Sequence, residues 1–197
     1  MLVKSAKAAQ RVLNGLIRYC EGRLKLVVNR VKSHAALLKS CVFLGYQIDR
    51  RGKLVWSQKA LHRFKQRVRE ITRRNRGHRV QDIINELRLY VRGWLNYYKL
   101  SATYTEVLKL TEWLRRRVRL YYWKQWKQPR TRRRKLLALG VFPEKVHMAT
   151  RSRKGYWRMS RNSIVHHALN NRWLEEQGVP DMRAIWIALH YGPKARV

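Results

Sequence analysis

A helical spacing of apolar residues runs through the middle of the chain and limits the fold more than any other feature of the sequence. From residue 57 the apolar positions recur every three or four residues, which predicts one helical face reaching to about residue 75 and carrying Leu61, Phe64, Val68 and Ile71. The same spacing predicts a second helix over 80–100 and a third over 104–128, ended by Pro129. Three helices joined by short loops indicate a three-helix bundle.

The N-terminal part, residues 1–56, predicts a smaller arrangement of mixed structure. An apolar stripe predicts a helix over 5–22, and residues 24–28 and 41–48 are each typical of a strand. A tight turn then returns the chain as a third strand over 53–56. One helix over a few strands makes a thin core, so we expect part of a domain here.

The C-terminal part is less regular. A basic run leads into a short helix that ends at Gly140, residues 143–160 read as loop and extended chain, and two short helices follow near 161–176 and 180–190.

These patterns together predict a mainly α fold. We expect a small α/β piece with a β-hairpin over 1–56, a three-helix bundle over 57–128 and a small irregular helical region over 129–197.

Positive charge dominates the composition. Lys and Arg number 46 against 11 Asp and Glu, which gives a formal net charge of +35. Such a fold repels itself unless a polyanion screens it, and nucleic-acid phosphates are the simplest counter-charge. A membrane surface would favour one basic amphipathic segment, whereas these cations run through the whole chain. No apolar stretch is long enough to span a bilayer, so we expect no membrane partner.

The predicted helices carry two basic faces. With Val107 at the centre of the buried face of the third helix, the opposite side carries Arg116, Arg119, Trp123 and Lys127. Cations with an aromatic ring suit phosphate neutralisation and base stacking. The alternative for this face is that Trp123 packs against the C-terminal segment and the arginines are merely solvated. On the second helix the cations that project together are Arg88, Arg92 and Lys99.

Two further basic clusters follow the third helix. The first lies between helices and consists of Arg130, Arg132, Arg133, Arg134 and Lys135. The second mixes cations with Tyr156 and consists of Arg151, Arg153, Lys154, Trp157 and Arg158. Both favour contact with irregular RNA, the alternatives being a solvated basic run and, for Trp157, a place in the core of a strand.

Residues typical of an independent enzyme are missing from the sequence. It contains no glycine-rich phosphate loop, and Asp49, Asp82 and Asp181 lie in unrelated predicted elements, so they cannot pair to hold metal ions. Cys20 and Cys41 are isolated, which favours a reducing compartment and argues against a zinc site. We expect no catalytic residue, metal or cofactor in this chain.

An ordered series of motifs resembles the C-terminal part of the group II intron reverse transcriptases, also called maturases. Residues 29–33 and the Phe-Leu-Gly-Tyr of 43–46 resemble the end of the palm and its hairpin. Residues 87–98 are similar to a thumb helix, and the next thumb helix resembles 115–119 with 123–127. The maturase-specific region, domain X, is similar to 139–140, 155–160, 168–171 and 173–174.

The resemblance implies roles residue by residue. The primer-grip hairpin, which holds the 3′ end of the growing strand, would be Phe43, Leu44, Gly45 and Tyr46. Lys32 would assist the leaving group only in an intact enzyme. The thumb would clamp an RNA template–DNA primer duplex, and thumb and maturase region together would bind group II intron RNA.

The chain also departs from that family. The family's catalytic Tyr-Ala-Asp-Asp segment would precede Val3, so the metal-binding aspartates are absent and Mg²⁺ is expected only with that missing palm. We therefore expect a C-terminal, RNA-binding fragment in the cytoplasm, of bacterial type. One alternative is half of a split RNA-directed DNA polymerase, active only with an N-terminal reverse-transcriptase partner. Another is a basic structural protein of ribosomal type, which leaves the motif order unexplained.

Overall fold

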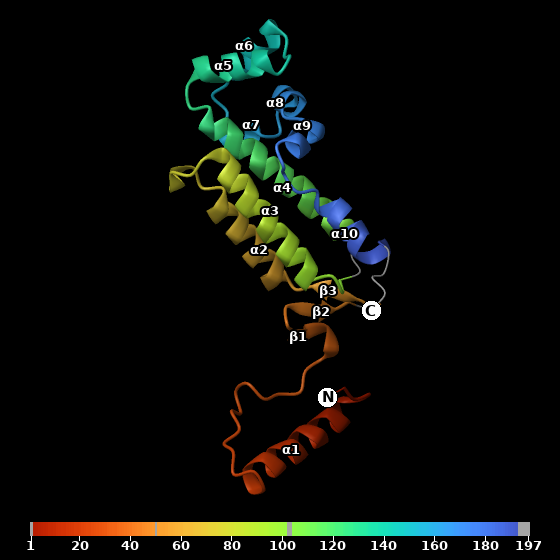
Figure 1. Cartoon of the computed structure of the whole chain (residues 1–197). Coiled ribbons are helices and arrows are strands. Elements are labelled where there is room, and N and C mark those ends of the chain that lie inside the picture. Colours follow the sequence, from red (N-terminus) through yellow and green to blue (C-terminus); the bar gives the residue numbers. More distant parts are fainter. Residues whose placement is uncertain (1, 50, 102–103, 193–197) are drawn as a thin grey trace. The chain divides into compact units, whose positions relative to one another are not determined.

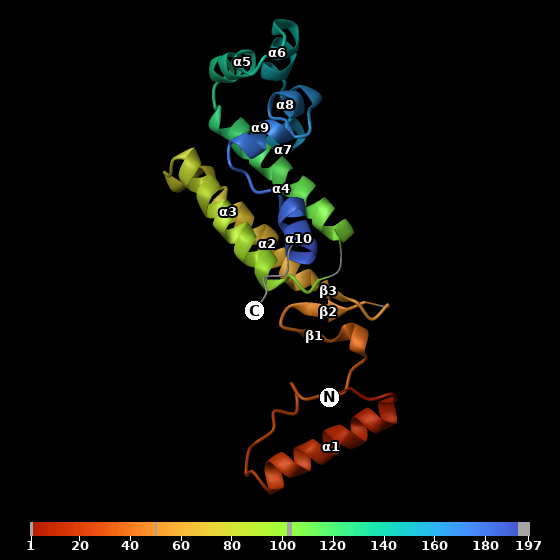
Figure 2. The ribbon, with the colours of Figure 1, turned by 45° about the vertical axis from the view of Figure 1, so that its right-hand side comes forward.

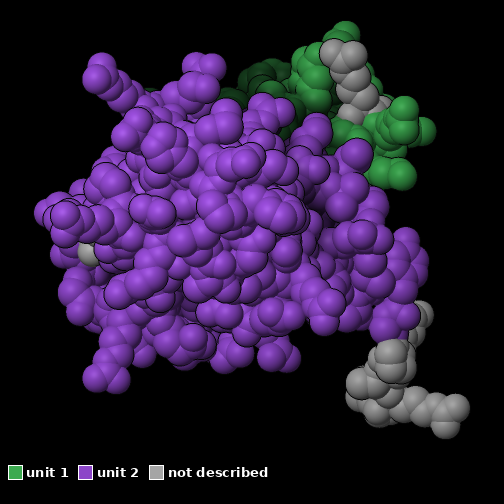
Figure 3. All heavy atoms as spheres, turned by 90° about the horizontal axis from the view of Figure 1, so that it is seen from above, with its two compact units in different colours: residues 1–57 green, residues 58–197 purple. Residues whose placement is uncertain are grey.

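The computed structural model of the chain describes residues 2–49, 51–101 and 104–192. The chain divides into two compact units, 1–57 and 58–197 (Figure 3). Helices dominate, and the sheet found among the described residues is a small antiparallel one of three strands (Figure 1). The predicted fold class, mainly α with a small hairpin region, is confirmed.

The N-terminal unit begins with the predicted helix, α1, which spans Ala6–Gly22. The hydroxyl of Ser5 caps it by accepting the N–H of Ala8 at 3.2 Å. The predicted strand over 24–28 is wrong. After α1 the N–H of Leu24 donates to the Tyr19 carbonyl and that of Leu26 to the Cys20 carbonyl, so these amides close the end of the helix instead of pairing in a sheet.

The sheet comes from the second half of the same unit, after a short 3-10 turn at Leu38–Ser40. Its strands are β1 at Val42–Phe43, β2 at Tyr46–Ile48 and β3 at Leu54–Trp56, in the order β1-β2-β3. The single strand expected over 41–48 is wrong because the chain reverses at Leu44 and Gly45, whose φ angles are +50° and +82°. Two successive positive φ angles are typical of a tight hairpin turn.

The apolar side chains of this unit are mostly exposed. Among residues 2–49 only Ile17 is buried, while Val27, Val31 and Phe43 lie largely in solvent. The thin core expected from the sequence is therefore observed for the described part of the unit.

The second unit is built on three long helices. They are α2 at Gln58–Ile71, α3 at Val80–Tyr97 and α4 at Tyr104–Gln125, each with a buried apolar stripe. The helix α2 ends earlier than expected, because the chain passes through the buried Thr72 into a short 3-10 turn at Arg74–Arg76. The long helices of the expected bundle are thus present.

The helix α4 lies at the centre of this unit. The last helix, α10 at Met182–Tyr191, packs on both α3 and α4, and the short α7 at Tyr156–Met159 packs on α4 (Figures 1 and 2). The indole N–H of Trp186 in α10 donates to the Ser101 carbonyl, 85 residues earlier, at 3.3 Å. The C-terminal helices therefore cover the side of α4 that was predicted from the sequence to be exposed to solvent.

Short helices fill the C-terminal part, where Pro129 begins α5 at Pro129–Ala138 instead of ending α4. Proline fits the first turn of a helix because the missing N–H has no partner there in any case. The loop expected over 143–160 is wrong, since it contains α6 at Pro143–Thr150 as well as α7. Only Val146 and Ala149 of α6 are buried, too few for a recognisable period.

The helix expected over 161–176 is two helices. They are α8 at Ser163–Ala168 and α9 at Asn171–Glu176, and the side chain of Asn170 caps the second by accepting the N–H of Trp173. The helix expected over 180–190 is confirmed as α10, with Asp181 as its N-terminal cap.

Candidate nucleic-acid interface

The arginine run of α4 joins the central helix to its neighbours. Arg115 pairs with Glu175 at 2.8 Å and with Asp181 at 3.4 Å. Arg117 reaches the other side of the helix, where it donates to the Thr72 hydroxyl at 2.8 Å. Most of this basic run therefore holds the unit together.

Arg119 shows the same role most clearly. It is only 4% exposed, and it donates to the Leu169 carbonyl at 2.7 Å and to Oδ1 of Asn171 at 2.8 Å. Burial, with a smaller effect of the nearby Arg115, lowers its pKa from 12.5 to about 10, so it stays charged near neutral pH. The expectation that Arg119 faces outward is wrong, because the connection between α8 and α9 covers it.

Trp123 also lies in the core, and it is 1% exposed. Its ring contacts Trp126 edge-on at 6.2 Å, and the guanidinium of Arg132 in α5 lies over it at 4.7 Å. The expectation of an outward-facing Trp123 is therefore wrong, and its contact with Arg132 fits the alternative of packing against the C-terminal segment. The other part of that alternative is wrong, because Arg116 and Arg119 have protein partners and are not merely solvated. Lys127 is exposed, beyond the end of α4.

Arg116 instead supports an exposed ring. Its guanidinium lies 3.8 Å from the ring centroid of Trp157 in α7, and it donates to the Trp157 carbonyl at 2.9 Å. The hydroxyl of Ser160, which is buried, donates to that same carbonyl at 2.7 Å. Trp157 nevertheless remains 40% exposed. The alternative of a place in the core of a strand is thus wrong for Trp157, which lies in a helix.

Tyr156 lies next to Trp157 in α7 and is flanked by two cations. The ammonium of Lys124 lies 5.4 Å from its ring centroid and the guanidinium of Arg132 lies 5.6 Å from it, while Tyr156 stays 41% exposed. We call these two rings, with Arg116, Lys124 and Arg132, the aromatic platform. Contacts from α4, α5 and α7 meet there.

The residues before and after those of the platform along the chain include many exposed cations. Between residues 124 and 162 the chain has thirteen Lys and Arg and a single acid, Glu144. None of these cations forms an ion pair within the described part of the chain. The predicted RNA-binding residues among them that lie exposed are Lys127, Arg130, Arg133, Arg134, Lys135, Arg151, Arg153, Lys154 and Arg158.

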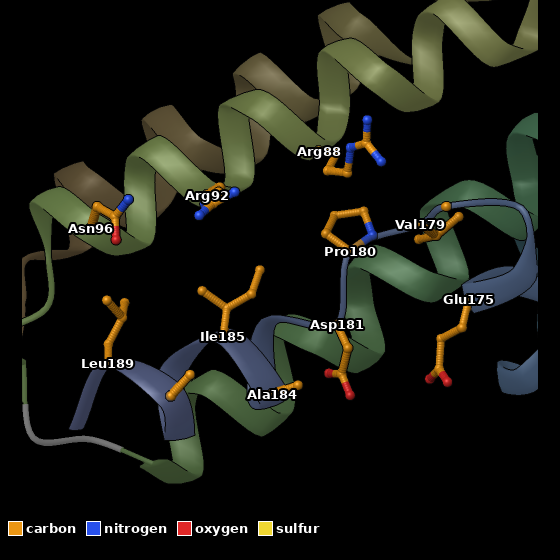
Figure 4. A pocket seen from close by; sticks show the side chains of 12 residues that line it. Arg88, Arg92, Asn96, Glu175, Val179, Pro180, Asp181, Ala184, Ile185 and Leu189 are labelled. Carbon is orange, nitrogen blue, oxygen red and sulfur yellow. The ribbon is translucent and has the colours of Figure 1, made fainter. Parts of the chain in front are cut away.

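A second basic feature is the groove between α3 and α10, with a volume of about 480 Å³. Arg88, Arg92 and Asn96 lie four residues apart on α3 and line one wall, and Ile185 and Leu189 lie on the α10 side (Figure 4). Both arginines are exposed, and neither has an ion-pair partner among the described residues. Lys99, expected to join them, lies beyond the end of α3 and does not line the groove.

The residues expected to form a primer grip lie at the β1–β2 turn of the N-terminal unit. Phe43 pairs with Tyr46, and Leu44 and Gly45 form the turn between them, so the hairpin is present while its role remains a prediction. Lys32 is exposed in the turn after Asn29, whose side chain accepts its backbone N–H at 3.1 Å.

Two residues of these surfaces escaped the sequence prediction of binding residues. Lys124 belongs to the platform, and Asn96 belongs to the groove. The spacing of Asn96 from Arg88 and Arg92 is a signal that could have identified it. No sequence spacing links Lys124 to Tyr156, because they meet only when α7 packs on α4.

Neither a metal-binding cluster nor a membrane-spanning helix is found in the described ranges. Those residues contain no group of three or more His, Cys, Asp or Glu placed to hold a metal ion. In the same ranges, no helix is both long enough and apolar enough to cross a bilayer.

Comparison with known families finds a match in the helical unit. Residues 61–139, from α2 to just past the end of α5, match the family model described as the group II intron, maturase-specific domain. This part of the chain is similar to a group II intron maturase domain. A search of curated proteins finds no significant match. The maturase match includes the three helices expected to form a thumb and also α5, the first helix of the region expected to follow. It therefore does not separate the two regions, and the boundary expected near residue 128 remains a prediction.

Proposed function

We propose that this maturase chain binds group II intron RNA through its cationic surface and assists splicing by stabilising the folded RNA. The observation that carries the proposal is the charge of the segment 124–162, which has thirteen cations and one acid. None of these cations forms an ion pair with a described residue. RNA phosphates are the partner that relieves this repulsion, and in such a role the intron supplies the catalyst while the protein supplies charge and shape.

Salt dependence tests the binding step. A protein that neutralises about 6–10 phosphates loses roughly 10³–10⁵-fold in affinity between about 50 and 200 mM salt, by analogy with duplex DNA. We expect a fall of this size for intron RNA. An affinity that does not change with salt would contradict an interface built on phosphate contacts.

A charge-matched pair of variants tests where the RNA binds. The first replaces four exposed cations of α5 by glutamine: Arg130, Arg133, Arg134 and Lys135. The control removes the same charge from exposed positions in and next to α1: Lys7, Arg11, Arg18 and Arg23. We expect the α5 variant to lose intron affinity and splicing activity far more than the control. Equal losses would mean that only net charge matters.

A second candidate function is that of the C-terminal half of a split RNA-directed DNA polymerase. The exposed apolar side chains of residues 2–49, with only Ile17 buried there, favour it because they suit a partner chain. The hairpin at Phe43–Tyr46 would then act as primer grip, and the thumb would clamp a template–primer duplex.

Primer extension separates the two functions. We expect no extension by this chain alone with Mg²⁺, because its described residues contain no group of acids placed to hold metal ions. Extension on adding an N-terminal reverse-transcriptase fragment would support the split polymerase. Extension by the purified chain alone would contradict both proposals.

A further inference from the structure

The aromatic platform places two exposed rings next to each other on α7, within the most cationic part of the chain. We infer that it is a binding site for unpaired bases, so that the chain prefers single-stranded or bulged RNA to an uninterrupted duplex. This inference rests on the proposed RNA binding and adds to it the class of RNA segment that is recognised.

The first step in the argument is that Trp157 is held ready for stacking. Arg116 covers one side of the indole at 3.8 Å, and its position is fixed by the bond to the Trp157 carbonyl. Two and three residues further along the chain, Met159 and Ser160 are each 1% exposed and anchor α7. A ring held in this way loses little conformational freedom on binding, which favours affinity.

The second step is that phosphate-binding groups lie where a stacked nucleotide would need them. Lys124 and Arg132 lie within 6 Å of the Tyr156 ring, at 5.4 and 5.6 Å. Arg132 is fixed in turn by its bond to the Trp126 carbonyl at 2.8 Å. Aromatic rings beside a cationic track are the combination by which proteins bind single strands without reading their sequence.

The third step concerns the choice of ligand. Bases inside an A-form duplex are already stacked on each other, and the deep, narrow major groove keeps side chains away from them, so exposed rings gain contacts only with unpaired bases. A protein partner would have to bring an acidic surface to this segment, with no aliphatic patch on α7 to receive it. The rings and cations together therefore favour RNA.

The size of the effect follows from stacking. Removing one aromatic ring from a stacked base costs about 1–3 kcal/mol, which corresponds to roughly 5–150-fold in affinity. A duplex that touches only the surrounding cations loses almost nothing on the same change.

The experiment compares Trp157→Ala, Trp157→Phe and the wild-type full chain. The binding of a fluorescent unstructured RNA of about 12 nucleotides and of a blunt RNA duplex of the same length is measured by anisotropy at one salt concentration. The control is Tyr191→Ala, which removes an even more exposed ring, 77% exposed, from α10 of the same unit. Thermal melting confirms that each variant is folded.

We expect Trp157→Ala to weaken single-strand binding by roughly 5–150-fold and duplex binding less than about 2-fold. Trp157→Phe should restore most of the affinity, and the control should change neither value. Equal losses of affinity for both RNAs, or no loss for the single strand, would contradict the inference that the platform binds unpaired bases. The exposed ring of Trp157 would then be better explained by contact with a protein partner. Absence of salt-dependent RNA binding by the wild type would instead overturn the proposed function itself.

Discussion

Arg119 offers the sharpest test of the conclusion that the basic run of α4 is structural. We consider two replacements, Arg119→Ala and Arg119→Met. Alanine removes both the guanidinium and its aliphatic stem, whereas methionine keeps an unbranched apolar chain in nearly the same space. The comparison therefore separates packing from hydrogen bonding.

The structure gives the size of each contribution. Losing the guanidinium leaves the carbonyl of the fully buried Leu169 without its donor, at a cost of about 1–3 kcal/mol. The exposed Asn171 regains water instead. The pKa of about 10, against 12.5 in solution, means that the buried cation itself is destabilised by roughly 3 kcal/mol, which its removal relieves. The stem of three methylenes contributes about 2 kcal/mol.

On removal of the guanidinium, the free energy lost with the hydrogen bond to Leu169 nearly cancels the free energy gained by no longer burying a cation. The packing of the aliphatic stem is then the main contribution to stability that differs between the two variants. We expect Arg119→Met to lie within about 1 kcal/mol of the wild type, and Arg119→Ala to be about 2 kcal/mol less stable than Arg119→Met. In a thermal melt the two variants should differ by roughly 4–8 °C.

Urea unfolding followed by far-UV circular dichroism measures both differences. Arg133→Met, which changes an exposed arginine of α5, is the matched control and should alter stability by less than about 0.5 kcal/mol. The reasoning is refuted if Arg119→Met is as unstable as Arg119→Ala. A tenfold loss of RNA affinity in a folded Arg119→Met protein would show that Arg119 contacts RNA after all.

Three further predictions concern other parts of the helical unit. Replacing Arg88 and Arg92 by glutamine removes two phosphate contacts and should reduce the slope of log affinity against log salt by about 1.4 for single-stranded RNA. An unchanged slope would show that the groove does not contact the RNA. Burial raises the pKa of Tyr122 to about 12, so roughly 2–3 kcal/mol of stability is present below pH 10 and is lost as the pH rises through 12. Tyr122→Phe cannot ionise and should keep that stability in urea unfolding at alkaline pH. If the variant loses as much stability as the wild type, the loss comes from another group. Leu136→Ala should destabilise α5 by about 2–5 kcal/mol and speed amide exchange in α5 and α6, whereas unaltered exchange would contradict a shared core there.

The long helices could be predicted because a repeated apolar spacing needs only local information. In α4 the stripe through Val107 and Leu114 is buried as expected. The opposite side is buried too, and the large apolar side chains of Leu120 and Trp123 on it were a sign that α4 is covered on more than one side. Treating Trp123 as an RNA ligand overlooked that sign.

The short elements could not be predicted in the same way. A helix such as α6, with two buried residues, has no period to detect, and a run such as 24–28 becomes a strand only if a neighbouring edge offers partners. For the candidate site, the sequence identified the clusters of cations. It could not show that Arg116 lies against Trp157, 41 residues away, because that contact depends on how α7 packs.

The position of α10 has a consequence for synthesis on the ribosome. Trp186 completes the packing around Ser101, and the intervening 85 residues take roughly 4–17 s to translate. During that interval the surfaces of α3 and α4 that α10 later covers are open in the nascent protein. The final folding step of the unit must therefore wait for the last helix to leave the exit tunnel, and a ribosome that stalls shortly before it would release a chain with an incomplete core.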